Sequence, residues 1–282
     1  MKLYVIGNGF DRHFRLPTGT DDFRSILANK KTFDCLPALE VFEGYGVNWG
    51  EYENSLADID IDDLINDNLI FPNYSSDHES DRNRGIIDAE LYIEYLNKAI
   101  NDSLEEMCKN ANETLPYIQL SSSDANIISP NSQIINFNYT STVEVLYGCQ
   151  CFHIHGSYDR KEKLVFGYCK SRETIAERQL QSDFEEDHDY YTDTQKEMYL
   201  ELYHSWKKEL RIDSLRRFLC TLNNIDEVIV LGHSISDVDL DYFELIDEIL
   251  KPDRWFVSYY DFNDLPGYEK LSFCSKVQLF HF

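Results

Sequence analysis

Four apolar segments of the sequence each end in a short cluster of glycine and polar residues, and these clusters hold side chains that could do chemistry. The clusters are Gly7-Asn8-Gly9, Asn138-Tyr139-Thr140, His155-Gly156-Ser157 and Gly232-His233-Ser234. Short continuous apolar runs that stop at such residues are typical of buried strands in a parallel sheet. The carboxyl ends of parallel strands meet at one edge, where open α/β sheets bind their ligands. We therefore expect residues far apart in sequence to line one pocket.

The residue types in these clusters limit the chemistry of the pocket. Glycine turns after a strand let backbone amides approach a phosphate group, although Arg12 interrupts the Gly-x-Gly-x-x-Gly pattern and leaves a plain strand-to-helix turn as an alternative. Asn138 offers a donor and an acceptor to a ribose hydroxyl or a water. His155 is suited to act as a general base near neutral pH. Because the clusters hold no strong nucleophile, covalent catalysis by a protein group is not indicated.

The elements that must position these clusters follow from the apolar pattern. Strands that precede the clusters are predicted at Leu3–Ile6, Gln133–Phe137, Cys151–Ile154 and Glu227–Leu231. Further strands are predicted at Leu164–Tyr168, Trp255–Tyr260 and Lys276–Phe282. Apolar residues at three-to-four spacing predict helices over Asp88–Asn110, Lys196–Leu222 and Leu240–Leu250. Capping-box spacing of Ser141 with Glu144, and of Ser236 with Asp239, indicates two helix starts. Loops are expected over Asp11–Thr20 and Tyr74–Gly85.

These elements predict an α/β, Rossmann-like fold with a mainly parallel sheet and helices on both faces. We expect one domain over residues 1–282, with helical insertions at about 20–130 and 171–225. The charged segment 171–193 is predicted to form an exposed helix and loop or a mobile lid.

Composition excludes several classes of function. The chain has 282 residues, with 26 Lys and Arg against 51 Asp and Glu, giving a formal net charge of −25. Such a charge repels nucleic acids and anionic membranes. The N-terminus lacks the pattern of a signal peptide, and no stretch has the apolar length of a membrane span. Seven cysteines, an odd number, indicate reduced thiols. We therefore expect a cytoplasmic protein that binds neither nucleic acid nor membrane.

The predicted strand that carries His153 could instead hold a metal ion. Cys149, Cys151, His153 and His155 alternate along the sequence, which places them on one face of an extended chain. Successive same-face residues of a strand are about 7 Å apart, so four ligands in one line cannot close a tetrahedron. We therefore expect no metal, and interpret His153 as a satisfied core or shell histidine.

The order of the motifs resembles that of a known family. Gly7-Asn8-Gly9-Phe10-Asp11, Asn136-Phe137-Asn138-Tyr139-Thr140, His153-Ile154-His155-Gly156-Ser157, and Gly232-His233-Ser234 with Asp239 resemble the sirtuin-like fold. More narrowly, they resemble the bacteriophage abortive infection AbiH family. The resemblance implies a Rossmann-like NAD-binding domain with Asn138 and His155 in its active site. It implies cofactor contacts from Gly7, Asn8, Gly9, Asp11, Tyr139, Thr140, Gly232, His233, Ser234 and Asp239.

The resemblance also implies an activity. Sirtuin-like domains in phage defence typically cleave NAD to nicotinamide and ADP-ribose, so we expect an NAD glycohydrolase of anti-phage abortive infection. Departures from the sirtuin pattern include Thr140, where a deacylase usually carries Asp, and the lack of a Cys-x-x-Cys zinc module. Deacylation is therefore not expected. A sensor that binds NAD or ADP-ribose without cleaving it is the alternative. The partners expected are NAD, a phage-derived activator or partner protein, and, as an open alternative, a second copy of the chain.

Overall fold

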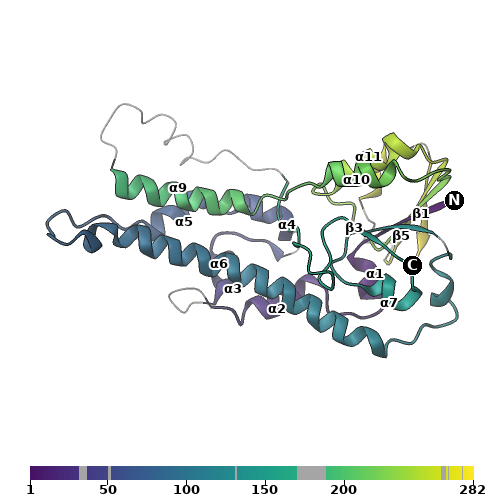
Figure 1. Cartoon of the computed structure of the whole chain (residues 1–282), viewed down its shortest axis with the longest axis horizontal. Helices are drawn as coiled ribbons and strands as arrows, with labels where there is room; N and C mark the ends of the chain where they lie inside the picture. Colours follow the sequence, from purple (N-terminus) through teal and green to yellow (C-terminus); the bar gives the residue numbers. More distant parts are fainter. Residues whose placement is uncertain are drawn as a thin grey trace. The chain divides into compact units, whose positions relative to one another are not determined.

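The computed structural model describes residues 1–31, 37–49, 52–130, 132–169, 189–261, 265, 267–274 and 276–282. The chain divides into two compact units (Figure 1). The sheet unit comprises Met1–Gly19, Glu105–Val165 and Glu209–Phe282, and the helical unit comprises Thr20–Leu104 and Phe166–Lys208. The predicted strand-end clusters all belong to the sheet unit.

The sheet unit is built on six parallel strands in the order β3-β2-β1-β4-β5-β6. The strands are β1 Lys2–Ile6, β2 Gln133–Asn136, β3 Phe152–His153, β4 Glu227–Leu231, β5 Arg254–Tyr259 and β6 Val277–His281. The chain builds outward from β1 to β3, then returns to place β4 on the other side of β1. This reversal is the topological switch point of a doubly wound sheet, and it confirms the predicted α/β, Rossmann-like fold.

Side chains of β1 alternate between two apolar cores. Leu3 and Val5 lie in one core with residues of α10 (Ile212–Leu219) and α11 (Leu240–Leu250). Tyr4 and Ile6 lie in the other with residues of α1 (Asn8–His13) and α7 (Thr142–Tyr147). Both faces of the sheet are therefore covered by helices, as its strands, apolar on both faces, require.

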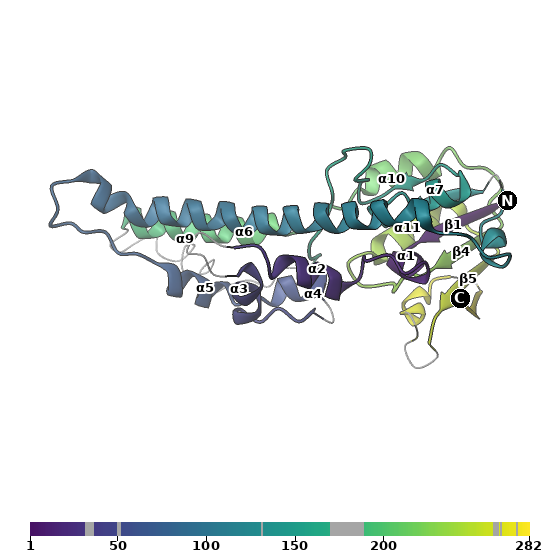
Figure 2. The ribbon, with the colours of Figure 1, turned by 90° about the horizontal axis from the view of Figure 1, so that it is seen from below.

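The helical unit contains α2 Thr20–Leu27, α3 Ala38–Gly44, α4 Tyr52–Ser55, α5 Ile61–Asn68 and α9 Tyr190–Ser205. The long α6, Glu79–Thr114, is one continuous helix (Figure 2) whose residues from Glu105 onward are counted in the sheet unit. Trp206 is buried in the helical unit, and its indole N–H donates to Asn97 Oδ1 at 3.1 Å. Among the described residues, no helix has the length and apolar character needed to cross a membrane.

The single helix predicted over Lys196–Leu222 is wrong, because the chain leaves the helix between α9 and α10. Tyr168 donates its backbone N–H to Trp206 O at 3.1 Å and accepts from Lys208 N at 2.7 Å. These contacts use backbone groups that a continuous helix would have needed. The strand predicted at Leu164–Tyr168 reduces to an isolated bridge between Tyr168 and Lys207.

Other helix boundaries also differ from the sequence prediction. α1 ends at His13, so it extends into the loop predicted from Asp11, and α6 begins at Glu79, inside the loop predicted to end at Gly85. Neither capping box forms: Ser141 makes no side-chain cap, and Asp239 rather than Ser236 is the N-cap of α11. The Glu144 and Asp239 carboxylates contact histidines instead. Most of the predicted segment 171–193 lies outside the described residues.

Candidate active site

The loops after β1 and β4 contact each other directly at the switch point. Gly7 N donates to Leu231 O at 2.9 Å, and Gly9 N donates to Gly232 O at 2.6 Å. A Cβ at Gly9 would lie 2.7 Å from Gly232 Cα. Glycine here thus permits two loops to touch. Both backbone N–H groups already donate within the protein, so neither is free to contact a phosphate in this structure. The phosphate contact predicted for Gly7 and Gly9 stays a prediction. Asn8 is exposed, and its amide donates to Thr18 O at 2.8 Å.

This close approach predicts a large stability cost for a methyl group at position 232. Gly232 has φ +62°, and a Cβ there would lie 2.2 Å from Phe10 N. Gly148, at the end of α7, has a similar φ of +65° with nothing within 4 Å. Gly148→Ala should cost about 1 kcal/mol for its left-handed backbone alone, whereas Gly232→Ala should cost at least about 3 kcal/mol. Denaturant unfolding of both variants checks this, and equal costs would contradict the close packing.

Asn138 lies at the carboxyl end of β2 and reaches over the end of β1. Its backbone N–H donates to Asn136 Oδ1 at 2.9 Å, and its Nδ2 donates to Gly7 O at 3.1 Å. These contacts fix the side chain, which belongs to a residue that is 6% exposed. The β2–β3 register pairs Asn136 with His153. Asn138 and His155 each lie two residues beyond this pair.

His155 shares the carboxylate of Asp239 with a second histidine. His155 Nε2 lies 3.1 Å from Asp239 Oδ1, and His233 Nε2 lies 3.5 Å from Asp239 Oδ2. All three residues are buried. A carboxylate only accepts hydrogen bonds, so the neutral His155 ring carries its hydrogen on Nε2. Its basic lone pair is then on Nδ1. Asp239, predicted as a cofactor contact, thus lies where it orients the His155 ring.

The tautomer of His233 is set from the other side of its ring. Ile235 N donates to His233 Nδ1 at 2.9 Å, so Nδ1 is an acceptor and the hydrogen of the neutral ring is on Nε2, toward Asp239. Ile235 adopts φ +54° in this loop, a conformation that β-branched residues rarely adopt. This strained turn places the His233 ring beside the Asp239 carboxylate.

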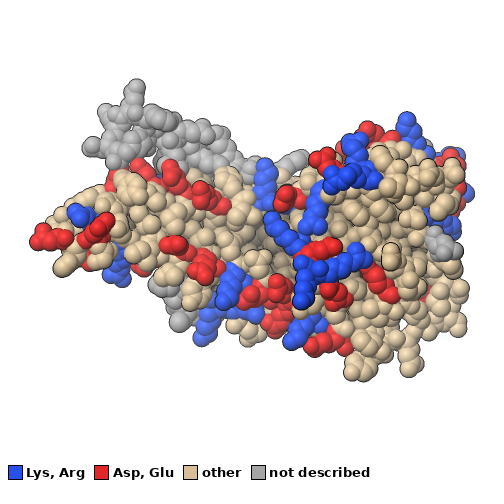
Figure 3. All heavy atoms as spheres, in the orientation of Figure 1, with Lys and Arg blue, Asp and Glu red and all other residues tan. Residues whose placement is uncertain are grey.

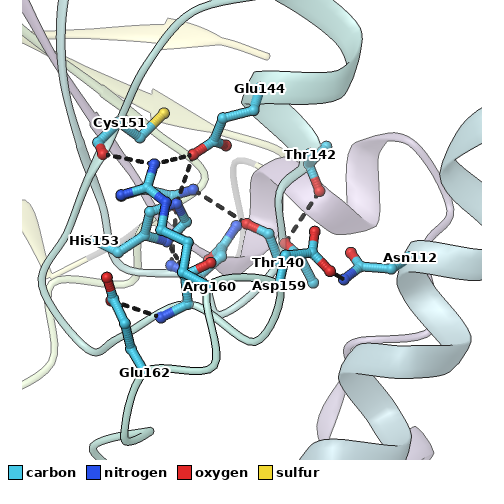
Figure 4. A network of polar contacts seen from close by, with 12 residues as sticks. Asn112, Thr140, Thr142, Glu144, Cys151, His153, Asp159, Arg160 and Glu162 are labelled. Carbon is cyan, nitrogen blue, oxygen red and sulfur yellow. Dashed lines mark hydrogen bonds and ion pairs between the residues drawn. The ribbon is translucent and has the colours of Figure 1, made fainter.

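A polar network that includes His153, Glu144 and Arg160 (Figure 4) contacts the backbone of Asn138. His153 Nδ1 lies 3.0 Å from Asn138 O, and its Nε2 lies 2.7 Å from Glu144 Oε1. Arg160 Nη2 donates to the same Glu144 oxygen at 3.1 Å. His153 is therefore a satisfied shell histidine, as predicted.

The same network contains a potential set of metal ligands. Glu144, Cys151 and His153 each offer one ligand atom, and these three atoms lie within 4.8 Å of one another. Two of the four alternating Cys and His residues, Cys151 and His153, thus lie close to a carboxylate of α7. Burial raises the pKa of the Cys151 thiol far above its ordinary value, which disfavours the thiolate that a metal needs. The His153–Glu144–Arg160 contacts account for the cluster as an ion-pair network.

Asp11 is fully buried beneath the site. Thr140 Oγ1 donates to Asp11 Oδ2 at 2.6 Å, and Thr140 Oγ1 lies 3.1 Å from Thr142 Oγ1. Asp11 Oδ1 has no hydrogen-bond partner within the described part of the chain. Burial, the dominant effect, raises the pKa of Asp11 to about 6. The predicted cofactor residues Asp11 and Thr140 are therefore engaged with each other.

The two remaining predicted residues, Tyr139 and Ser234, are more exposed to solvent than Asn138 and His155. Tyr139 donates its hydroxyl to Val165 O at 2.8 Å, and its ring lies 6.5 Å from that of His155. Ser234 is exposed, and its carbonyl accepts from Gly267 N at 2.8 Å.

Arg211 also lies close to His155, although it was not predicted as a site residue. Its backbone N–H donates to the hydroxyl of Tyr242, whose ring lies 5.7 Å from that of His155. No local pattern indicated this residue, because the predicted helix over Lys196–Leu222 placed it in a helix interior. In the structure, Arg211 is the N-cap residue of α10.

Comparisons with known proteins complete the description of the site. No curated protein and no solved structure matches this chain. The model of one family, described as bacteriophage abortive infection AbiH, matches residues 3–259. Since this match covers most of the sequence and includes all four strand-end clusters, the chain belongs to the AbiH family and has a role in bacteriophage abortive infection.

Proposed function

We propose that this chain is a sirtuin-like NAD glycohydrolase, which converts NAD and water to nicotinamide and ADP-ribose in abortive infection. The observation that carries the proposal is the His155–Asp239 pair, 3.1 Å apart, at the carboxyl edge of the sheet, where Asn138 also follows its strand. A doubly wound sheet binds its ligands at this edge. The resemblance of the motifs to sirtuin-like domains supports NAD as the substrate.

The residues have distinct roles in this proposal. Asn138, held by Gly7 O and Asn136 Oδ1, positions the nicotinamide ribose or the attacking water. His155 Nδ1 takes the proton of that water or of a ribose hydroxyl, while Asp239 stabilises the resulting imidazolium. The bond between the ribose carbon and the pyridinium nitrogen breaks, and its electron pair leaves with nicotinamide. This reaction depends on positioning and electrostatics, which suits a site without a strong nucleophile.

The engaged glycine amides and the burial of the catalytic residues favour the alternative function. Asn138 and His155 are only 6% and 4% exposed, and Gly7 N and Gly9 N are bonded to the β4 loop. A protein in this state would bind NAD or ADP-ribose, or await an activator, without turnover. The same assay distinguishes the two functions.

The test is chromatography of NAD incubated with wild-type protein, His155→Ala and Asn138→Ala. The wild type should release nicotinamide and ADP-ribose, and each variant should be slower by roughly 100- to 10,000-fold. His78→Ala, which removes an exposed histidine of the helical unit, serves as the matched control and should retain activity. If wild type releases nothing but binds NAD in a calorimetric titration, the sensor function is supported. If it neither cleaves nor binds NAD, both proposals fail.

A further inference from the structure

Arg211 is a half-buried cation in a strongly acidic protein. Basic side chains gather over α10 on the face seen in Figure 3. Arg216, on the same helix, lies 3.9 Å from Glu248. By contrast, no carboxylate in the described part of the chain forms an ion pair with Arg211. A guanidinium that has no carboxylate partner among the described residues, and that lies beside a buried histidine, favours a ligand of opposite charge.

Two sets of contacts fix Arg211 beside His155. The first runs through the loop after β3: Arg211 Nη2 donates to Lys163 O at 2.7 Å. That carbonyl packs against Gly156, where a Cβ would lie 2.4 Å from Lys163 O. Gly156 follows His155 directly and has φ +87°. The guanidinium is therefore one carbonyl group away from the backbone of the predicted base.

The second set of contacts runs through α11. Arg211 N donates to Tyr242 Oη at 2.9 Å, and the Tyr242 ring lies 5.7 Å from the His155 ring and the same distance from the Phe137 ring. Both the backbone and the side chain of Arg211 are thus held in place. Holding the side chain in advance lowers the entropy cost of binding a ligand.

We propose that Arg211 is the anion-binding residue of this site and that it binds a phosphate group of the substrate. The proposal rests on the proposed function for the identity of the substrate, a dinucleotide with a pyrophosphate. A guanidinium presents five N–H donors in a planar fork that matches two phosphate oxygens, and one Nη2–H is used by Lys163 O. Arg211 thereby supplies a contact that Gly7 N and Gly9 N, already bonded to the β4 loop, do not offer.

Local charge strengthens the inference. A net charge of −25 repels a dinucleotide in solution, so a site for one needs a cation at the point of binding. Lys163, which contributes the carbonyl, pairs its own ammonium with Glu209 at 3.4 Å. Arg211 therefore provides a positive charge close to His155 with which no described carboxylate forms an ion pair.

The test uses calorimetric titration with two probes, ADP-ribose, which carries the pyrophosphate, and adenosine, which carries none. Arg211→Gln should weaken ADP-ribose binding by roughly 10- to 100-fold, whereas adenosine binding should stay within about twofold. Arg211→Lys, which keeps the charge and loses the fork, should fall between wild type and Arg211→Gln. Arg216→Gln on the same helix is the matched control and should bind like wild type. A second readout is KM for NAD, which should rise in Arg211→Gln.

The outcomes separate this inference from the proposed function. Wild type that binds ADP-ribose through Arg211 but releases no nicotinamide supports the anion site and contradicts the hydrolase. Wild type that cleaves NAD, with Arg211→Gln unchanged in KM and in ADP-ribose affinity, supports the hydrolase and overturns the anion site. Absence of ADP-ribose binding by wild type also overturns the anion site. If Arg211→Gln does not fold, the comparison of Arg211→Lys with wild type decides.

Discussion

Replacement of Asp239 by asparagine is expected to slow NAD cleavage by roughly two to four orders of magnitude without unfolding the protein. The reason lies in which ring nitrogen of His155 carries the hydrogen. In the wild type, Asp239 Oδ1 accepts from His155 Nε2 at 3.1 Å, which leaves Nδ1 basic. An asparagine has one accepting oxygen and one donating nitrogen, so it cannot accept from both histidines.

His233 decides which way the asparagine would turn. Because Ile235 N occupies His233 Nδ1 at 2.9 Å, the neutral His233 ring presents N–H toward position 239. The asparagine oxygen would therefore face His233, and its amide N–H would face His155. His155 would then place its hydrogen on Nδ1 and lose the basic lone pair there. The variant keeps the shape of the site and reverses the tautomer of its base.

Controls distinguish this mechanism from a general loss of charge. Asp237→Asn makes the same chemical change at an exposed carboxylate that pairs with Lys270 at 2.7 Å, and cleavage should be unaffected. Adding His233→Leu to Asp239→Asn lets the asparagine oxygen turn to His155, so the double variant should be more active than Asp239→Asn alone. Rates of nicotinamide release, with circular dichroism to verify folding, provide the measurement. Wild-type activity in Asp239→Asn would exclude Asp239 as the residue that orients His155.

The sequence predicted the sheet well because strand signals in this chain are local. Each central strand is a short apolar run that ends at a glycine or asparagine, and the helix Leu240–Leu250 was predicted with the bounds it has in the structure. Contacts between distant residues were not predictable in this way. The helix predicted through Trp206 is interrupted because Tyr168 pairs with the chain on either side of Lys207, and no local pattern encodes that pairing.

In the candidate site, too, local signals were predictable and contacts between distant residues were not. The sequence places Asn138 and His155 at strand ends, and a parallel sheet brings strand ends together. The partner of each polar side chain depends on loop geometry instead. Glu144 and Asp239 fit helix-capping spacing, yet their carboxylates contact His153 and His155. Tertiary contacts to buried histidines outcompete a surface cap, because a buried polar group without a partner costs more than an open helix end.

The wild type is expected to lose about 3 kcal/mol of its free energy of unfolding as Asp11 ionises, and Asp11→Asn should remove this loss. Burial raises the pKa of Asp11 from 3.8 to about 6 in the folded protein. Between these values the folded state binds more protons than the unfolded state. The free energy of unfolding of the wild type therefore falls as pH rises from about 4 to about 6, and the ionised carboxylate lowers stability at all higher pH.

An asparagine at position 11 does not titrate, so the variant should lack this loss. The difference in unfolding free energy between Asp11→Asn and wild type should shift in favour of the variant by about 2.4 kcal/mol between pH 4 and pH 8. Comparing the two pH values cancels any constant cost of the new amide N–H groups beside Thr140. Denaturant unfolding at both pH values measures the shift, and Asp253→Asn, at an exposed aspartate, is the matched control. Parallel curves for Asp11→Asn and wild type would show that Asp11 is ionised in the folded protein at no cost, and its burial beside Thr140 would then need a compensating charge.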